Sequence, residues 1–188
     1  MNPPLLAIEQ AALVRGGRRL FEGLDLRLEA GEAVLVTGPN GIGKSSLLRL
    51  AAGLLAPAAG RVERAPAALV DEHIALDEKL PLGRALDFWA KLDGGDAQAG
   101  MAAMGIAHLA DVPVRMLSTG QRKRAALARL IAADRPLWLL DEPANGLDSD
   151  GLERLAAIIA AARSAKRAIL AASHQPIGLD DHQTVKLG

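Results

Sequence analysis

The feature that most constrains this chain is the stretch at residues 34–48, which reads VLVTGPNGIGKSSLL. It joins a short apolar run to a glycine-rich turn and then to a segment of helical character. Two glycines, a lysine and a serine fall at the spacing G-x-x-x-x-G-K-[ST] over residues 38–45, and the apolar run at 33–36 supplies the strand that this spacing requires before it. A chance glycine-rich turn would lack both flanks, so we predict a strand, a phosphate-binding loop and a helix in succession.

The chemistry of this loop follows from its backbone. Glycines let the chain curl so that successive N–H groups point inward, and the helix beginning near Lys44 aims its positive end at the same place. Lys44 can then reach the β- and γ-phosphates of a nucleotide, and the Ser45 hydroxyl can ligate Mg²⁺. The predicted nucleotide contacts of the loop are Gly38, Pro39, Asn40, Gly41, Ile42, Gly43, Lys44, Ser45 and Ser46.

Length and composition narrow the function classes. The chain has 188 residues, which suits one compact domain, and its 22 Lys and Arg balance its 22 Asp and Glu, so no basic field supports a nucleic-acid partner. It has no cysteine, which excludes disulfides and thiolate metal sites and favours a reducing compartment such as the cytoplasm. No apolar run approaches the roughly 18 residues of a membrane span, and the first residues do not read as a signal peptide.

The first third of the chain predicts mainly strands. Apolar and polar residues alternate over 24–28, as in a half-buried strand, and 5–9 and 18–21 are its expected neighbours. The strand at 33–36 lacks alternation, as a strand covered on both faces should. Further short strands are expected at 61–63 and 67–70 after the first helix. We therefore predict an antiparallel β edge that leads into a buried parallel core.

The rest of the chain predicts helices alternating with buried strands. Residues 82–92 have the i, i+3, i+4, i+7 apolar spacing of an amphipathic helix, and the segments up to residue 117 extend it into a small helical insertion. Expected next are a helix from about 120 to 133, a strand at 137–140, a helix capped by Asp148 or Ser149, and a strand at 167–173. This order predicts an α/β fold, a single domain over 1–188 with a mainly parallel sheet, helices on both faces and a helical subdomain at about 82–117.

A pair of carboxylates follows the strand at 137–140. The string LWLLDE places Asp141 and Glu142 where α/β folds bind ligands, at the carboxyl end of a parallel strand. Asp141 would hold the Mg²⁺ shell, while Glu142, on the other side of the pleat, would polarise a water for attack on the γ-phosphate. Taken alone, this string could be a strand that ends in a polar loop. Together with the phosphate-binding loop, it favours a site for Mg²⁺ and catalysis.

A second anion site is predicted at the string LSTGQ. Ser118 and the Gly120 amide lie at the start of a helix, where backbone N–H groups favour negative charge. Taken alone, this string is better explained as an ordinary capped helix.

The order of these motifs along the chain resembles the ATP-binding cassette (ABC) ATPase family. The shared strings are the loop at 38–45, LSTGQ at 117–121, the D-E-P at 141–143, NGLD ending in Asp148, and a strand ending in His174. The resemblance covers nearly the whole chain and implies the RecA-like fold of P-loop NTPases. It also implies an enzyme that hydrolyses ATP, with Lys44, Glu142 and His174 as catalytic residues.

The same resemblance implies a head-to-tail homodimer. ATP would lie between the phosphate loop of one subunit and the Ser118, Gly120 and Gln121 segment of the other. His174 would contact the γ-phosphate, and Asp148 would lie at the dimer seam. Nucleotide binding would then drive closure of the dimer, and hydrolysis would release it.

Three positions depart from the family pattern. No aromatic side chain stands before the first glycine turn to stack on adenine, and Arg15 could stack through its guanidinium plane instead, or could be a plain exposed arginine. No glutamine follows the strand at 67–70, so Asp71, Glu72 or His73 would have to take over its contacts with Mg²⁺ and the membrane partner. Thr119 stands where glycine is commoner.

Within the family, several strings resemble the ATP-binding subunits of haem exporters for cytochrome c biogenesis, among them TGPNGIGKSSLLRLAAGLL and PLWLLDEPANGLD. This implies separate integral membrane permease subunits and a peripheral position on the cytoplasmic face of the inner membrane. The alternatives are the ATPase of another small-substrate transporter, a soluble ABC ATPase without a transport role, and a regulatory cassette without activity.

Overall fold

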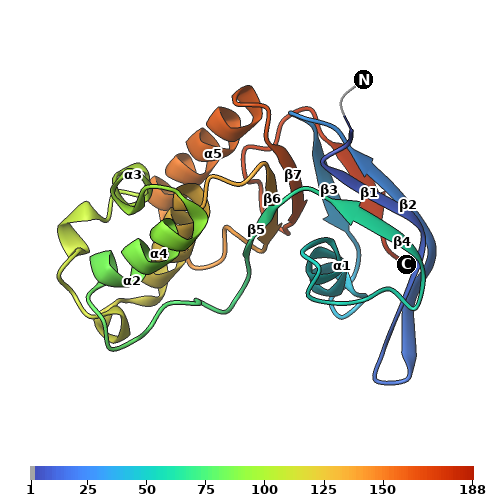
Figure 1. Ribbon diagram of the computed structural model, residues 1–188, viewed down its shortest axis with the longest axis horizontal. Helices are drawn as coiled ribbons and strands as arrows, with labels where there is room; N and C mark the ends of the chain where they lie inside the picture. The colour runs from blue at the N-terminus through green and yellow to red at the C-terminus, as the bar shows by residue number, and fades with distance from the viewer. Residues whose placement is uncertain (1–2) are drawn as a thin grey trace.

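The N-terminal strands form an antiparallel sheet of their own. The computed structural model describes residues 3–188, and Figure 1 shows the sheets packed beside a cluster of helices. The sheet has the order β2-β1-β4, with bounds β1 Leu6–Arg15, β2 Arg18–Leu28 and β4 Ala59–Arg64. Ile8 of β1 lies opposite Leu26 of β2 and Val62 of β4. The predicted antiparallel N-terminal part is confirmed, but residues 18–21 and 24–28 belong to one strand, β2, instead of two neighbouring strands, and β1 is longer than predicted.

The second sheet has five strands, all parallel where they pair. Its order is β5-β6-β7-β3-β8, with bounds β3 Ala33–Thr37, β5 Ala67–Val70, β6 Leu137–Asp141, β7 Ala168–Ala172 and β8 Gln183–Lys186. The strands β3, β5, β6 and β7 were predicted. The sequence pattern missed β8, because this edge strand is short, polar and largely exposed.

Alternate residues of the parallel strands enter two separate apolar cores. Trp138 and Leu140 of β6 pack with the helices α4 (Thr119–Ala132) and α5 (Ser149–Ser164), whereas Leu137 and Leu139 pack with α1 (Lys44–Ala51) and the antiparallel sheet. Because successive strand residues point to opposite faces, a continuous apolar run fills both cores. The prediction of a parallel sheet covered on both faces is therefore confirmed.

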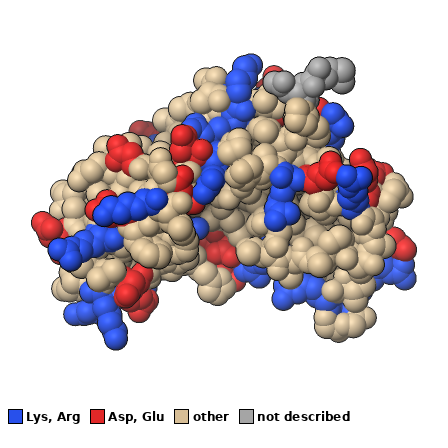
Figure 2. Space-filling model, viewed as in Figure 1, with Lys and Arg blue, Asp and Glu red and all other residues tan. Residues whose placement is uncertain are grey.

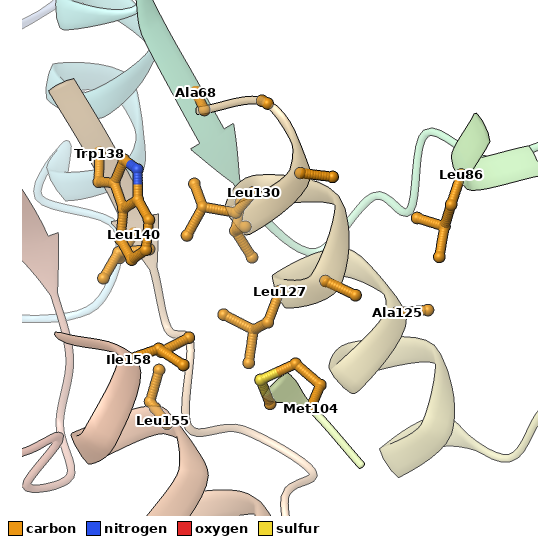
Figure 3. Packing of buried hydrophobic residues seen from close by; sticks show 14 of the residues in the cluster. Ala68, Leu86, Met104, Ala125, Leu127, Leu130, Trp138, Leu140, Leu155 and Ile158 are labelled. Atoms are coloured by element: carbon orange, nitrogen blue, oxygen red, sulfur yellow. The ribbon is translucent and has the colours of Figure 1, made fainter. Parts of the chain in front are cut away.

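The helical part of the molecule is organised around α4, which begins at Thr119, one residue before the predicted start. The helices α2 (Leu82–Asp93) and α3 (Ala97–Ala103) pack on it, and the 3₁₀ turns η1 (Ala107–Leu109) and η2 (Val114–Met116) lead into it. Figure 3 shows Leu127 and Leu130 of α4 pointing toward the β6 and α5 side chains. Movement of α4 would thus disturb both the helices and the sheet.

The surface carries mixed charge. Figure 2 shows Lys and Arg interspersed with Asp and Glu over the face in view, as expected from a formal net charge of zero. Within residues 3–188, no helix is both long enough and apolar enough to cross a membrane.

Candidate functional site

The glycine-rich loop connects β3 to α1, as the motif predicts (Figure 1). Gly38 has a φ of +140°, and a Cβ atom there would lie 2.5 Å from the carbonyl oxygen of Leu187. Gly43 has a φ of +121° and precedes the first helical residue, Lys44. These backbone conformations disfavour other residues, so the two glycines set the curl of the loop and the direction of the helix N-terminus.

Lys44 lies folded over the loop. Its side chain is buried, and Nζ donates to the carbonyl oxygens of Gly38 at 2.8 Å and Pro39 at 3.2 Å. The same nitrogen is 3.2 Å from Nε2 of His174. The lysine charge is thereby held over the concave side of the loop, where phosphate oxygens would bind.

Ser45 and Ser46 occupy the first turn of α1, and Ser46 is buried. Ser45 and Asp141, at the end of β6, line the same two cavities beside the loop. Burial raises the pKa of Asp141, and the nearby Ser45 hydroxyl opposes the rise. A hydroxyl and a partly buried carboxylate side by side suit Mg²⁺, which takes oxygen ligands and commonly uses one or two carboxylates together with substrate phosphates.

Glu142 lies outside the strand, which corrects the prediction that it follows on the other side of the pleat. The strand β6 ends at Asp141, and Glu142 has a φ of +46°, a left-handed conformation that is costly for this residue type. Its N–H donates to the carbonyl oxygen of Ala172 at 2.8 Å. The turn directs the carboxylate toward His174, whose backbone N–H lies 3.3 Å from Oε2.

His174 follows β7, and its side chain reaches the loop that follows the neighbouring strand β3. Its Nε2 lies 2.9 Å from Oδ1 of Asn40, 3.2 Å from Nζ of Lys44 and 3.5 Å from Oε1 of Glu142. The structure therefore brings together the three predicted catalytic side chains from three distant segments. A cation, an imidazole and a carboxylate surround one point at the loop.

Gly41 is exposed, while Ile42 packs its side chain against the core that contains α1. Arg15 is exposed and lies in the same cavity as the loop, a space of about 440 Å³ that Leu20 also lines. The structure thus places Arg15 beside the loop, a position compatible with the stacking alternative for this residue.

Ser118 caps α4. Its hydroxyl accepts from the Gln121 N–H at 3.3 Å, and the Gln121 side-chain oxygen accepts from the Ser118 N–H at 2.9 Å. This reciprocal pair rigidifies the helix start. A Cβ atom at Gly120 would lie 2.9 Å from the carbonyl oxygen of Gly146, so the chain after β6 passes close to this helix end.

Asp148, rather than Ser149, is the N-cap of α5. It accepts from the Gly151 N–H at 2.9 Å and forms an ion pair with Arg124 of α4. Arg124 also pairs with Asp150 at 2.7 Å. The sequence did not single out Arg124 as a site residue. The basic run after LSTGQ was visible, but which of its members turn inward depends on the packing of α4.

The segment after β5 contains the acidic residues that replace the expected glutamine. Asp71 pairs with Arg49 of α1 at 3.2 Å and accepts from the His73 N–H at 2.9 Å. Asp71 and Glu72 line a cavity that Ser45 and Asp141 also line. The described residues include no cluster of three or more His, Cys, Asp or Glu arranged to hold a metal ion. A metal here would depend on the serine, the carboxylates and the phosphates of a nucleotide.

Comparison with known proteins agrees with this geometry. Residues 21–145 match the family described as ABC transporter. The protein called "Cytochrome c biogenesis ATP-binding export protein CcmA" from Sphingopyxis alaskensis is 55% identical over 188 residues, covering 98% of this chain and 97% of that protein. The protein of the same name from Zymomonas mobilis is 51% identical, with coverages of 97% and 84%.

Among solved structures, one described as the ATP binding subunit of an ABC transporter superposes with a TM-score of 0.88 at 20% identity, covering 97% of this chain and 85% of that one. At this identity the superposition supports the fold alone. The family match and the full-length relatives show that the chain belongs to the ABC transporter family, as an ATPase of the CcmA group.

Proposed function

We propose that this chain is the ATP-hydrolysing subunit of a transporter that exports haem for the assembly of c-type cytochromes. The observation that carries the proposal is 55% identity, over nearly the whole of both chains, to a protein named as the CcmA export protein of cytochrome c biogenesis. The membrane-crossing path would belong to separate permease subunits. The chain would then act at the cytoplasmic face of the inner membrane.

In the proposed mechanism the loop residues 38–46 hold the phosphates, and Lys44 leaves its two carbonyl partners to contact the β- and γ-phosphates. Ser45 and Asp141 would hold Mg²⁺, which would neutralise charge on the phosphate oxygens. Glu142 would orient a water and polarise it for attack on the γ-phosphate, with His174 contacting the same phosphate. The convergence of Lys44, Glu142 and His174 within 3.5 Å contacts supports these roles.

The proposed active unit is a head-to-tail homodimer. The Ser118, Gly120 and Gln121 segment of one copy would close the nucleotide site of the other, with Asp148 at the seam. The exposed position of Ser118 at the start of the 14-residue helix α4 supports this dimer, because the N–H groups of the first helical turn favour an anion that comes from outside the chain. Arg15 would cover the adenine of the nucleotide in its own chain.

We propose that residues 82–117 act as the helical subdomain that receives the permease. An apolar groove of about 390 Å³ lies where this segment begins, lined by Phe88 and Trp89 of α2 and by Leu76 and Leu80 just before it. Phe88 lines this groove edge-on against Trp89 and is 61% exposed, and exposed apolar surface gathered at a groove is typical of a protein–protein contact site. A short apolar cytoplasmic segment of the permease would cover this groove.

The test is genetic and biochemical. Deleting the gene in its own host should abolish staining for covalently bound haem on c-type cytochromes, and a plasmid copy of the wild-type gene should restore it. Glu142→Gln should not restore staining, because its ATP turnover should fall by at least about a hundredfold when the water is no longer polarised. Glu153→Gln removes an exposed carboxylate of α5 and is the matched control.

Undiminished staining in the deletion strain would overturn the haem-export proposal. Equal ATP turnover by wild type and Glu142→Gln, with the permease present, would overturn the catalytic roles instead.

A further inference from the structure

A cavity of about 380 Å³ lies where α4 faces the carboxyl ends of β5 and β6. Four carboxylates line it: Asp71 and Glu72 after β5, and Asp141 and Glu142 after β6. Ser45 lines it as well, so it is continuous with the proposed Mg²⁺ ligands. Four negative charges around one small space repel one another and require compensation.

Most cations near this cavity are already engaged. Arg49 pairs with Asp71 at 3.2 Å. Arg122 pairs with Glu78 at 3.0 Å and donates to two backbone carbonyl oxygens of the segment that precedes α4. Their charges are held by specific partners, and their positions are fixed by those contacts.

Lys123 differs from both arginines. It is half-buried on α4 and lines the cavity, yet within residues 3–188 it has no ion pair at 4.0 Å or less. Burial lowers the pKa of Lys123, and the carboxylates of Asp141, Asp71, Glu142 and Glu72 oppose that change. The Lys123 ammonium thus lies at one wall of the cavity. All four carboxylates attract it, but none of them forms a close ion pair with it.

We infer that Lys123 is a positioning residue for ATP hydrolysis. Its positive charge, carried by α4, partly compensates the negative charge of the four carboxylates that line the cavity. The inference rests on the proposed function, because the cavity matters only if Mg²⁺ and the γ-phosphate bind beside it. A cation at this wall weakens the binding of a divalent metal ion in the cavity and strengthens the binding of phosphate. Because it is carried by α4, a shift of the helices would alter the charge that the metal and the phosphate meet.

The inference predicts two opposite changes in one variant. Lys123→Met keeps much of the side-chain volume and removes the charge. Binding of Mn²⁺ alone should become tighter by roughly three- to tenfold, whereas binding of ATP in EDTA should weaken by a similar factor, as expected for one charge at several ångströms in a partly solvated site. Mn²⁺ binding is measured by electron paramagnetic resonance, and ATP binding by equilibrium dialysis.

Three comparisons make the test specific. Lys123→Arg retains the charge and should bind both probes within about twofold of wild type. Lys91→Met removes an exposed cation from α2 and is the control for net charge, so it should change neither affinity. In turnover assays with Mg²⁺, Lys123→Met should raise the KM for ATP and lower kcat, and Lys123→Arg should restore both.

The possible outcomes separate the inference from the function on which it rests. If wild type binds ATP and Lys123→Met binds both probes as wild type does, the inference is wrong and the proposed function stands. Weaker binding of both probes would indicate a packing defect and would also overturn the inference. If the wild-type chain itself binds no ATP, both proposals fall together.

Discussion

At the scale of single residues, Arg124 joins three parts of the molecule. Its side chain is only 12% exposed, and it donates to the carbonyl oxygen of Met104 at 3.1 Å, just after α3. It also pairs with Asp148 and Asp150 at the start of α5. A planar guanidinium can satisfy several acceptors in fixed directions, which a lysine cannot. Arg124 therefore fixes the position of the segment that would lie at the dimer seam.

This arrangement predicts a pH-dependent stability. The hydrogen bond from Arg124 lowers the pKa of Asp148, and those from Arg154 and Arg124 lower the pKa of Asp150. The pKa of an aspartate in the unfolded chain is about 3.9, so the stabilisation is complete above about pH 5 and is lost as the pH falls through the lowered folded values. We expect the difference in urea midpoint between wild type and Asp148→Asn to shrink between about pH 6 and about pH 3.

Asn can still cap a helix, so Asp148→Asn removes the charge and keeps the cap. Asp111→Asn is the control for removal of an exposed carboxylate from the helical part, and its difference from wild type should be equal at the two pH values. A difference for Asp148→Asn that stays constant, or grows toward low pH, would contradict the assigned role of the ion pairs.

At the scale of elements, α3 and α4 are in backbone contact. A Cβ atom at Gly100 would lie 2.2 Å from the carbonyl oxygen of Ala128 and 3.0 Å from its carbonyl carbon. Alanine favours a helix over glycine by about 1 kcal/mol, but here the added methyl group must push two helices apart. Gly100→Ala should therefore lower the free energy of unfolding by about 1–3 kcal/mol, measured by urea denaturation.

Gln98→Ala, on the exposed side of α3, is the control and should change this free energy by no more than about 0.5 kcal/mol. A stabilised Gly100→Ala variant would mean that helix propensity outweighs the contact, contrary to the packing that we describe.

The elements that could be predicted are those whose own sequence has a regular hydrophobic pattern. The strands β3, β6 and β7 are buried apolar runs, and α2 has regular amphipathic spacing, so local pattern and tertiary packing agree. The strand β8 carries little pattern, because its side chains are mostly polar and exposed, and it is recognised as a strand through its pairing with β3. Likewise, alternation placed Glu142 on a pleat, whereas the hydrogen bond to Ala172 and the left-handed φ turn it toward His174. Such contacts between distant segments cannot be read from spacing.

At the scale of the whole molecule, the proposed nucleotide site would be divided between two surfaces of the chain. The cavity beside the phosphate loop is lined by Arg15, Lys44 and Glu142, among others, whereas Ser118 lines a different cavity of about 400 Å³ with Arg124 and Asp148. The two cavities share no lining residue. In the proposed head-to-tail dimer, each of these two surfaces would meet the other surface of a second copy.

This division predicts an ATP-dependent dimer that needs Ser118. With its formal net charge of zero, the chain has no net repulsion between copies to overcome. Glu142→Gln should bind ATP without hydrolysing it, so in ATP and Mg²⁺ it should elute as a dimer in size-exclusion chromatography with light scattering. Adding Ser118→Arg should return the protein to monomers, because a bulky cation would occupy the space of the partner's nucleotide.

Ser164→Arg, at the exposed end of α5, makes the same substitution away from that cavity and should leave the dimer intact. A dimer that survives Ser118→Arg, or forms equally without ATP, would show that the copies meet through another surface and that the two cavities do not share one nucleotide.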